Sequence, residues 1–152
     1  MNKVLILLGS TSDEAVMSES VRYLDWFGID NDMIVASAHR DPEKVTKLTT
    51  EASANGYSVI IAAAGMAAAL PGVVAAHTDL PVLGVPLEGG LQGGIDALYS
   101  IVQMPAGIPV GTLAVGKAGA RNAAVLAARI IKLSDDGLDA RFAEFKNKGF
   151  KL

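Results

Sequence analysis

Two short polar segments carry the residue types that do acid–base and phosphate chemistry. The first, Gly9-Ser10-Thr11-Ser12-Asp13, follows an apolar run and leads into a helical pattern. A glycine and several hydroxyls at a helix N-terminus offer N–H and O–H donors to a phosphate or carboxylate. Asp13 can either cap the helix or accept a hydrogen bond from a ligand hydroxyl, so a purely structural cap remains the alternative. The segment lacks the Gly-Lys-Ser/Thr ending of a Walker A loop and the last glycine of G-x-S-x-G.

The second segment is Ser37-Ala38-His39-Arg40-Asp41, and it also follows an apolar run. His39 can exchange a proton near neutral pH, and the Arg40 guanidinium can bind a phosphate through two parallel hydrogen bonds. The structural alternative is a surface turn in which Asp41 begins a helix. A serine nucleophile activated by His39 stays open as well, although the turn does not resemble a nucleophile elbow. We predict a proton-transfer group beside a phosphate clamp.

Two further loops carry few ionisable groups. Residues 64–70 carry no ionisable group and have mostly small side chains around Gly65, which suit either close approach of a ligand or tight packing. Residues 86–94 contain four glycines, and such a loop is suited to closing over a ligand. The second histidine, His77, falls at a predicted helix end and is interpreted as a C-terminal cap. Two histidines and no cysteine argue against a transition-metal site.

Five β-rich apolar runs must position these loops. They cover residues 4–8, 33–36, 59–63, 82–85 and 110–115, and their continuous apolarity is typical of parallel strands covered on both faces. Helical patterns separate them, which predicts an α/β fold with an open, doubly wound parallel sheet and right-handed crossovers. Ligands bind such sheets beyond the carboxyl ends of the strands, so the four loops should meet at one edge.

The helical patterns have recognisable ends. An apolar stripe from Met17 to Phe27 stops at Gly28, which is a typical C-cap, and Asp41 with Pro42 is a typical helix start. Further helices are predicted over residues 70–76, 95–104, 118–133 and 136–146.

The predicted helix over residues 118–133 has an unusual composition. Its polar side chains form only a narrow strip of Arg121, Arg129 and Lys132, so most of its circumference should be buried. One sheet covers only one side of a helix, and a second subunit is therefore expected to cover another. An unusually alanine-rich surface helix is the alternative.

Composition narrows the class of protein. The chain has 152 residues, 51% of them hydrophobic, which suits one domain spanning residues 1–152. So much apolar surface on a small chain favours a homo-oligomer. The net charge of −3 argues against nucleic-acid and membrane-surface binding, and the absence of cysteine excludes a disulfide scaffold or a thiol nucleophile. Without a recognisable signal peptide, the expected location is cytoplasmic.

Taken together, the motifs resemble the PurE family of purine biosynthesis. The resemblance covers nearly the whole chain and is carried by GSTSD, SAHRDP, ALPGVVAAHTDLPVLGVP and SIVQMPAGIPVGTLAVGKAGARNAAVLAARI. It implies a flavodoxin-like three-layer α/β/α sandwich and an octamer with each active site at a subunit junction. It also implies migration of a carboxyl group in N5-carboxyaminoimidazole ribonucleotide, from the exocyclic nitrogen to C4 of the imidazole, without a metal or other cofactor.

The resemblance also implies roles for single residues. Ser10 and Asp13 match substrate-binding positions of the first motif, and Ser37 and Arg40 match ligand contacts of the second. His39 matches the general acid/base. The loop after the third strand departs from the family pattern, because Met66 replaces a glycine and Ala69 replaces a histidine.

The expected activity is therefore that of a mutase acting on a small-molecule ribonucleotide. One alternative is direct carboxylation of aminoimidazole ribonucleotide by carbon dioxide. A catalytically weak ligand-binding protein is a second alternative, motivated by Ala69. An FMN carrier is a third, and the low aromatic content of 5% disfavours it.

Overall fold

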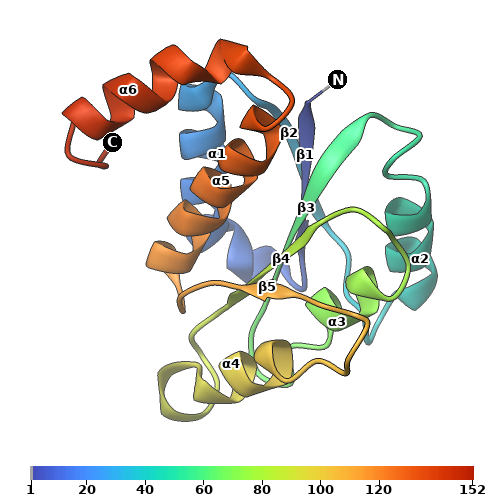
Figure 1. Ribbon diagram of the computed structural model, residues 1–152. Helices are drawn as coiled ribbons and strands as arrows, with labels where there is room; N and C mark the ends of the chain where they lie inside the picture. The colour runs from blue at the N-terminus through green and yellow to red at the C-terminus, as the bar shows by residue number, and fades with distance from the viewer. Residues whose placement is uncertain (1) are drawn as a thin grey trace.

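A parallel five-stranded sheet forms the centre of the computed structural model, which describes residues 2–152 (Figure 1). Its strands are β1 (Lys3–Leu8), β2 (Asp30–Val35), β3 (Tyr57–Ala64), β4 (Val82–Pro86) and β5 (Gly111–Thr112). They are arranged in the order β2-β1-β3-β4-β5. The chain runs outward from β1 to β2 and then returns to β3 on the other side. The direction of winding thus reverses between β1 and β3, as in a flavodoxin-like fold.

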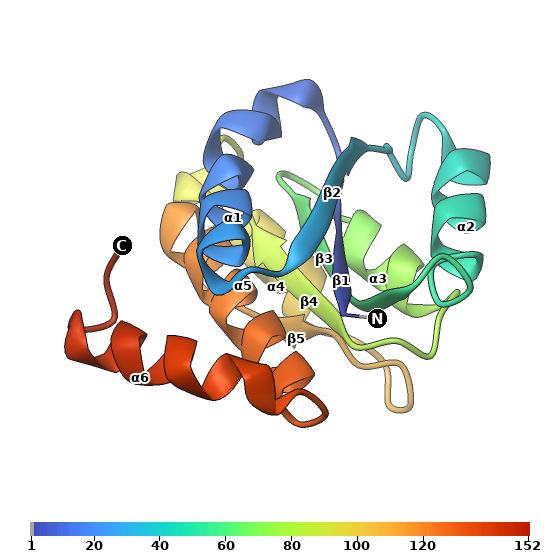
Figure 2. The same ribbon diagram turned by 90° about the horizontal axis from the view of Figure 1, so that it is seen from above.

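Helices cover both faces of the sheet and give the predicted three layers (Figure 2). One face carries α1 (Glu14–Phe27) and α5 (Lys117–Lys132), and the other carries α2 (Pro42–Thr50), α3 (Leu70–Ala75) and α4 (Ile95–Val102). The C-terminal α6 (Asp139–Asn147) lies outside α1 and α5, and a single 3-10 turn (Asp136–Leu138) precedes it. Of the helices within residues 2–152, none is both long and apolar enough to cross a membrane.

The apolar strand runs are buried as the sequence predicted. In β1, Val4, Ile6 and Leu8 point into the core under α1 and α5, while Leu5 and Leu7 point into the core on the opposite face. All five side chains are completely buried. Because both faces are covered, the strand needs no alternation of polar and apolar residues.

The helix ends agree with the predicted caps. Gly28 ends α1 with a φ of 74°, a left-handed conformation in which glycine meets no steric penalty. Asp41 begins α2, where its Oδ1 accepts a hydrogen bond from the Lys44 N–H at 3.2 Å. Local sequence signals therefore placed these ends correctly.

The last strand is much shorter than predicted. Only Gly111 and Thr112 pair regularly with β4, where a strand was expected over residues 110–115. The following segment still leans on β4, because the Leu113 N–H donates to Gly84 O at 2.9 Å and the Gly116 N–H donates to Pro86 O at 2.9 Å. The chain then turns toward α5 at Gly116, whose φ is 72°.

The alanine side chains of α5 that were expected to need cover from a second subunit are buried within the chain itself. Ala120, Ala124 and Ala127 are fully buried in the core shared with α1 and the sheet. The Ser20 hydroxyl of α1 donates to Ala120 O at 2.6 Å, which shows how closely the two helices pack. Small side chains allow this approach, and α1 thereby supplies the cover that was expected from another subunit.

The polar strip of α5 is anchored to its neighbours. Arg121 Nε donates to Glu19 Oε2 at 2.7 Å, and Arg22 Nη2 binds the same oxygen at 2.7 Å. These two guanidinium groups lower the pKa of the Glu19 carboxyl to about 2. Lys132 likewise forms an ion pair with Asp139 of α6.

Candidate active site

A cavity of about 490 Å³ lies at the carboxyl edge of the sheet, where all four predicted loops meet. All five predicted site residues, Ser10, Asp13, Ser37, His39 and Arg40, line this cavity. The register explains why they meet, since Leu8 of β1 is paired with both Val35 and Ala63. Strands that end level with each other bring their following loops together. The cavity also lies at the point where the winding reverses.

The first loop is both a helix cap and a wall of the cavity. Ser10 Oγ accepts hydrogen bonds from the Ser12 N–H at 3.3 Å and the Ser12 hydroxyl at 3.1 Å. Asp13 Oδ2 accepts from the Ser10 N–H at 3.0 Å, which completes a capping box. The Ser10 hydroxyl oxygen thus accepts two hydrogen bonds, and its own O–H can still donate one to a ligand. The capping alternative is correct, and the capping serine also lines the cavity.

Asp13 is a carboxyl whose pKa is raised by its surroundings. Burial raises the pKa of this carboxyl, and the hydrogen bond from the Ser10 N–H opposes the shift. A carboxylate in this place is held by one backbone donor and is half-buried. A ligand hydroxyl would supply a second donor and stabilise the charged form.

The second loop is a tight turn that presents His39 and Arg40. Ser37 Oγ accepts from the Arg40 N–H at 3.3 Å, and Ser37 O accepts from the Asp41 N–H at 2.9 Å. Both side chains at the tip are exposed. The Lys44 ammonium donates to Val35 O at 2.7 Å and holds the end of β2 beneath the turn. A rigid turn thus carries a flexible cation and an imidazole at the mouth of the cavity.

The third loop places strained backbone at the cavity. Met66 has a φ of 54°, in the left-handed region, and its side chain is 66% exposed. Such a conformation costs a residue with a side chain roughly 1–2 kcal/mol, and glycine adopts it freely. Ala69 begins α3 and directs only a methyl group at the cavity. His39 is therefore the one imidazole among the described residues that line this cavity.

The fourth loop is folded back on Asp96 of α4. The Asp96 carboxylate accepts from the Leu91 N–H at 3.0 Å and from the Ala97 N–H at 2.9 Å. A Cβ on Gly90 would lie 2.1 Å from Asp96 Oδ2, so only glycine permits this approach. The loop is thereby pinned at its middle, with Glu88 and Gly89 at the cavity.

Glu88 is a cavity residue that sequence reasoning did not single out. It is exposed and stands two residues beyond the end of β4. Its position after a buried strand was a usable signal, because side chains just beyond strand ends face the ligand edge. The cavity is thus lined by two carboxyl groups, those of Asp13 and Glu88, as well as by Arg40 and His39.

His77 lies elsewhere, as predicted. It follows α3, and its Nδ1 lies 2.7 Å from Val73 O, the distance of a hydrogen bond that caps the helix end. It borders a larger hollow of about 760 Å³ near the amino ends of β4 and β5, which contains none of the predicted site residues. Within residues 2–152 no three His, Asp or Glu side chains are grouped closely enough to hold a metal ion.

Known proteins share both the sequence and the fold of this chain. The family model described as AIR carboxylase matches residues 3–151. N5-carboxyaminoimidazole ribonucleotide mutase from Haemophilus influenzae is 51% identical over 144 residues, covering 95% of this chain and 88% of the relative. The enzyme of the same description from Escherichia coli K12 is 50% identical over 144 residues, covering 95% of this chain and 85% of the relative.

Solved structures agree with the sequence matches. The crystal structure of Treponema denticola PurE superposes with a TM-score of 0.88 at 29% identity, covering 98% of this chain and 92% of that chain. A 3-dehydroquinate dehydratase-like protein from Bifidobacterium longum reaches a TM-score of 0.57 at 14% identity, covering 87% of this chain and 99% of that chain. The second likeness concerns the fold alone.

Proposed function

This chain belongs to the AIR carboxylase family, and from that premise we propose that it is an N5-carboxyaminoimidazole ribonucleotide mutase of purine biosynthesis. One observation carries the proposal: over 95% of the chain, about half of the residues are identical to those of enzymes of that description. The enzyme is then an isomerase that moves a carboxyl group from the exocyclic nitrogen to C4 of the imidazole ring.

The cavity offers suitable partners for such a ribonucleotide. We assign the 5′-phosphate to the Ser10 hydroxyl and the Arg40 guanidinium, which supply a neutral and a charged donor from the loops after two neighbouring strands. Ser37 supports the turn and can donate its hydroxyl to the ligand. Asp13 is assigned to a ribose hydroxyl, from which its carboxylate can accept a hydrogen bond.

His39 is the group assigned to the proton transfers. The N–C bond of the carbamate breaks, carbon dioxide is released into the cavity, and the exocyclic nitrogen gains a proton. C4 then attacks carbon dioxide, and the C4 proton must leave to restore the aromatic ring. One imidazole can give the first proton and take the second, so the net proton balance is zero. With Ala69 in place of a second imidazole, His39 carries both steps.

The alanine-rich wall suits the trapped gas. Ala67, Ala68 and Ala69 line the cavity beside Gly65, and none of them has a polar side chain that would hold water in place of carbon dioxide. A small apolar wall keeps released carbon dioxide close to C4 and keeps its effective concentration high.

The decisive experiment supplies purified protein with N5-carboxyaminoimidazole ribonucleotide in the absence of ATP. Formation of the C4 carboxylate at an enzymatic rate is expected. Conversion of aminoimidazole ribonucleotide with bicarbonate, but not of the carbamate, would instead identify a direct carboxylase. Binding of the carbamate without turnover would identify a ligand-binding protein.

Arg40→Ala is expected to weaken substrate binding by about 10–100-fold, because a charged hydrogen bond to phosphate is worth about 1.5–3 kcal/mol. Lys47→Ala is the matched control, since Lys47 is an exposed cation in the last turn of α2 and lies outside the cavity. Isothermal titration with the substrate or its product measures both. Equal affinities of the two variants would remove Arg40 from the phosphate site.

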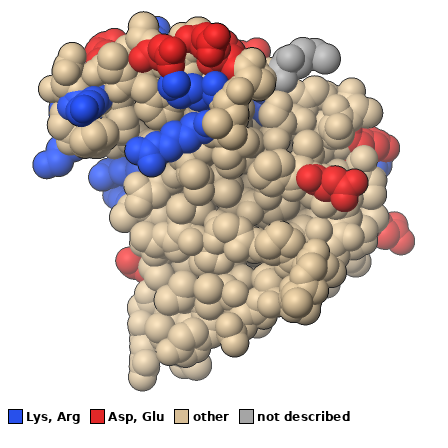
Figure 3. All heavy atoms as spheres, in the orientation of Figure 1, with Lys and Arg blue, Asp and Glu red and all other residues tan. Residues whose placement is uncertain are grey.

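We further propose that the protein is a homo-oligomer, an octamer, with α4 at an interface. Tyr99 and Val102 of α4 are 62% and 46% exposed, and Leu91 just before the helix is 72% exposed. Figure 3 shows the part of this face formed by α4 and β5 almost without charged side chains. Exposed apolar side chains on an uncharged surface are typical of protein interfaces.

Tyr99→Glu is accordingly expected to reduce the assembly, because a charge buried without a partner opposes association. Leu133→Glu is the matched control, since Leu133 is 88% exposed at the end of α5, away from α4. Light scattering at micromolar concentration measures the mass of each variant. A wild-type mass equal to one chain would contradict the oligomer itself.

The setting of the reaction follows from its substrate. A phosphorylated ribonucleotide is charged and crosses a bilayer poorly, so we propose that the enzyme works in the cytoplasm, where such compounds are made. We also propose that residues 1–152 act as one domain.

A further inference from the structure

We propose that a hollow between α5 and the C-terminal segment is a second ligand site, suited to a small anion that carries a planar ring, such as a nucleoside monophosphate. The hollow measures about 330 Å³, at the lower end of the range of small-molecule sites. Its lining comes from α1, α5, α6 and the C-terminal residues: Tyr23, Ala118, Arg121, Asn122, Val125, Arg129, Phe145, Phe150 and Lys151. None of these residues lines the proposed active site.

The charge of the hollow is positive. Arg121, Arg129 and Lys151 line it, and no carboxylate does. Arg121 spends its Nε on Glu19, whereas Arg129 and Lys151 form no ion pair with any residue in the described part of the chain. Figure 3 shows Lys and Arg side chains gathered over this end of α5 and α6. Two cations without an acidic partner in one hollow favour an anionic ligand.

An exposed aromatic ring borders the same hollow. Phe150 is 55% exposed and has a φ of 61°, so it combines an unfavourable backbone conformation with an apolar side chain in water. Its N–H donates to Phe145 O at 2.9 Å, and the two rings meet edge to face at 5.7 Å. The chain therefore turns back at the end of α6 and holds the Phe150 ring in a defined place. A strained residue held in this manner points to a binding role.

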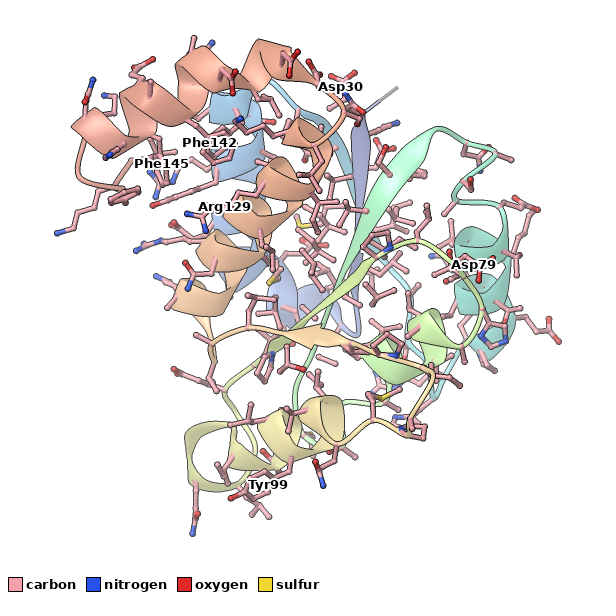
Figure 4. The ribbon with its side chains drawn as sticks, viewed as in Figure 1. Asp30, Asp79, Tyr99, Arg129, Phe142 and Phe145 are labelled. Atoms are coloured by element: carbon pink, nitrogen blue, oxygen red, sulfur yellow. The ribbon has the colours of Figure 1, made fainter. Side chains whose placement is uncertain are left out.

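Arg129, Lys151 and Phe150 all line the same hollow, so one ligand in it can meet the cations and the ring. In Figure 4, Arg129 from α5 and Phe145 from α6 lie where the two helices face each other. A phosphate between Arg129 and Lys151 would leave an attached base within reach of Phe150, on whose face it can stack. The exposed amide of Asn122 can donate to and accept from the polar edge of such a base.

The experiment is a calorimetric titration of the wild-type protein with adenosine 5′-monophosphate. Adenosine and inorganic phosphate are titrated separately. We expect the monophosphate to bind saturably and more tightly than adenosine or inorganic phosphate alone. Arg129→Gln should weaken it by about tenfold through loss of the charged hydrogen bond. Phe150→Leu should weaken it by about fivefold or more through loss of stacking, while keeping an apolar side chain in the same place.

Two controls separate this site from others. Lys148→Gln removes an exposed cation of the same C-terminal segment that does not line the hollow, and it should leave the affinity unchanged. Arg40→Ala reports on the proposed active site, which also suits a ribonucleotide. Binding that survives Arg129→Gln and is lost in Arg40→Ala would overturn the proposal. So would the absence of saturation at millimolar monophosphate, or inorganic phosphate binding as tightly as the monophosphate.

Discussion

His39→Asn is expected to lower turnover of the carbamate substrate by roughly 10²–10⁴-fold, while the protein stays folded and binds ligand. Asparagine can donate and accept hydrogen bonds, but it cannot exchange a proton near neutral pH. Because His39 is the only imidazole among the described residues lining the cavity, no second histidine there can replace it. Steady-state kinetics measure the loss, and the residual activity should show no acid limb in its pH–rate profile.

His77→Asn is the matched control for this prediction. The two variants each remove one of the two imidazoles in the chain. His77 lies within hydrogen-bond distance of Val73 O at the end of α3 and outside the cavity, so its loss should change turnover by no more than a few-fold. A fully active His39→Asn enzyme would refute the assigned mechanism. An inactive, folded His77→Asn protein would transfer the proton-moving role to His77.

Gly119→Ala is expected to destabilise the fold by about 3 kcal/mol, near the upper end of the usual cost of overpacking. A Cβ on Gly119 would lie 1.7 Å from Ala114 O, and the obstacle is backbone, which cannot rotate away as a side chain can. The segment that contains Ala114 is also tied to β4 through the Leu113 and Gly116 N–H groups. Chemical denaturation measures the free energy of unfolding of the variant and of the wild type.

Asn122→Ala provides the comparison on the same helix. Asn122 is exposed on α5, and its substitution should change the free energy of unfolding by no more than about 0.5 kcal/mol. Equal stability of Gly119→Ala and the wild type would show that α5 can move away from the preceding segment without cost.

Local chemistry in the sequence determined much of the fold. Gly28 and Asp41 marked helix ends because a left-handed C-cap and a side-chain N-cap depend on only a few neighbouring residues. The unbroken apolar run of β1 indicated a strand covered on both faces, and in the structure both faces of β1 are buried. Once parallel strands were expected, the polar loops after β1 and β2 had to share an edge, and Ser10 and His39 do line one cavity.

Long-range packing decided the features that the sequence left open or misassigned. The alanines of α5 indicate a buried helix but not the partner that buries it, and α1 of the same chain takes that place. The close approach of Asp96 to Gly90 depends on how the loop folds back, which no residue spacing specifies.

The remaining differences also arise between segments far apart in the chain. Glu88 reaches the cavity because β4 ends level with β3, and the register of two strands is a property of the assembled sheet. The hollow beside Phe150 unites Tyr23 with Lys151, whose positions in the sequence say nothing of each other. The sequence by itself thus determined the elements and the chemistry of the loops, because short-range sterics and hydrogen bonds act within a few residues. Only the tertiary structure decided which surfaces meet, because that depends on packing between distant side chains.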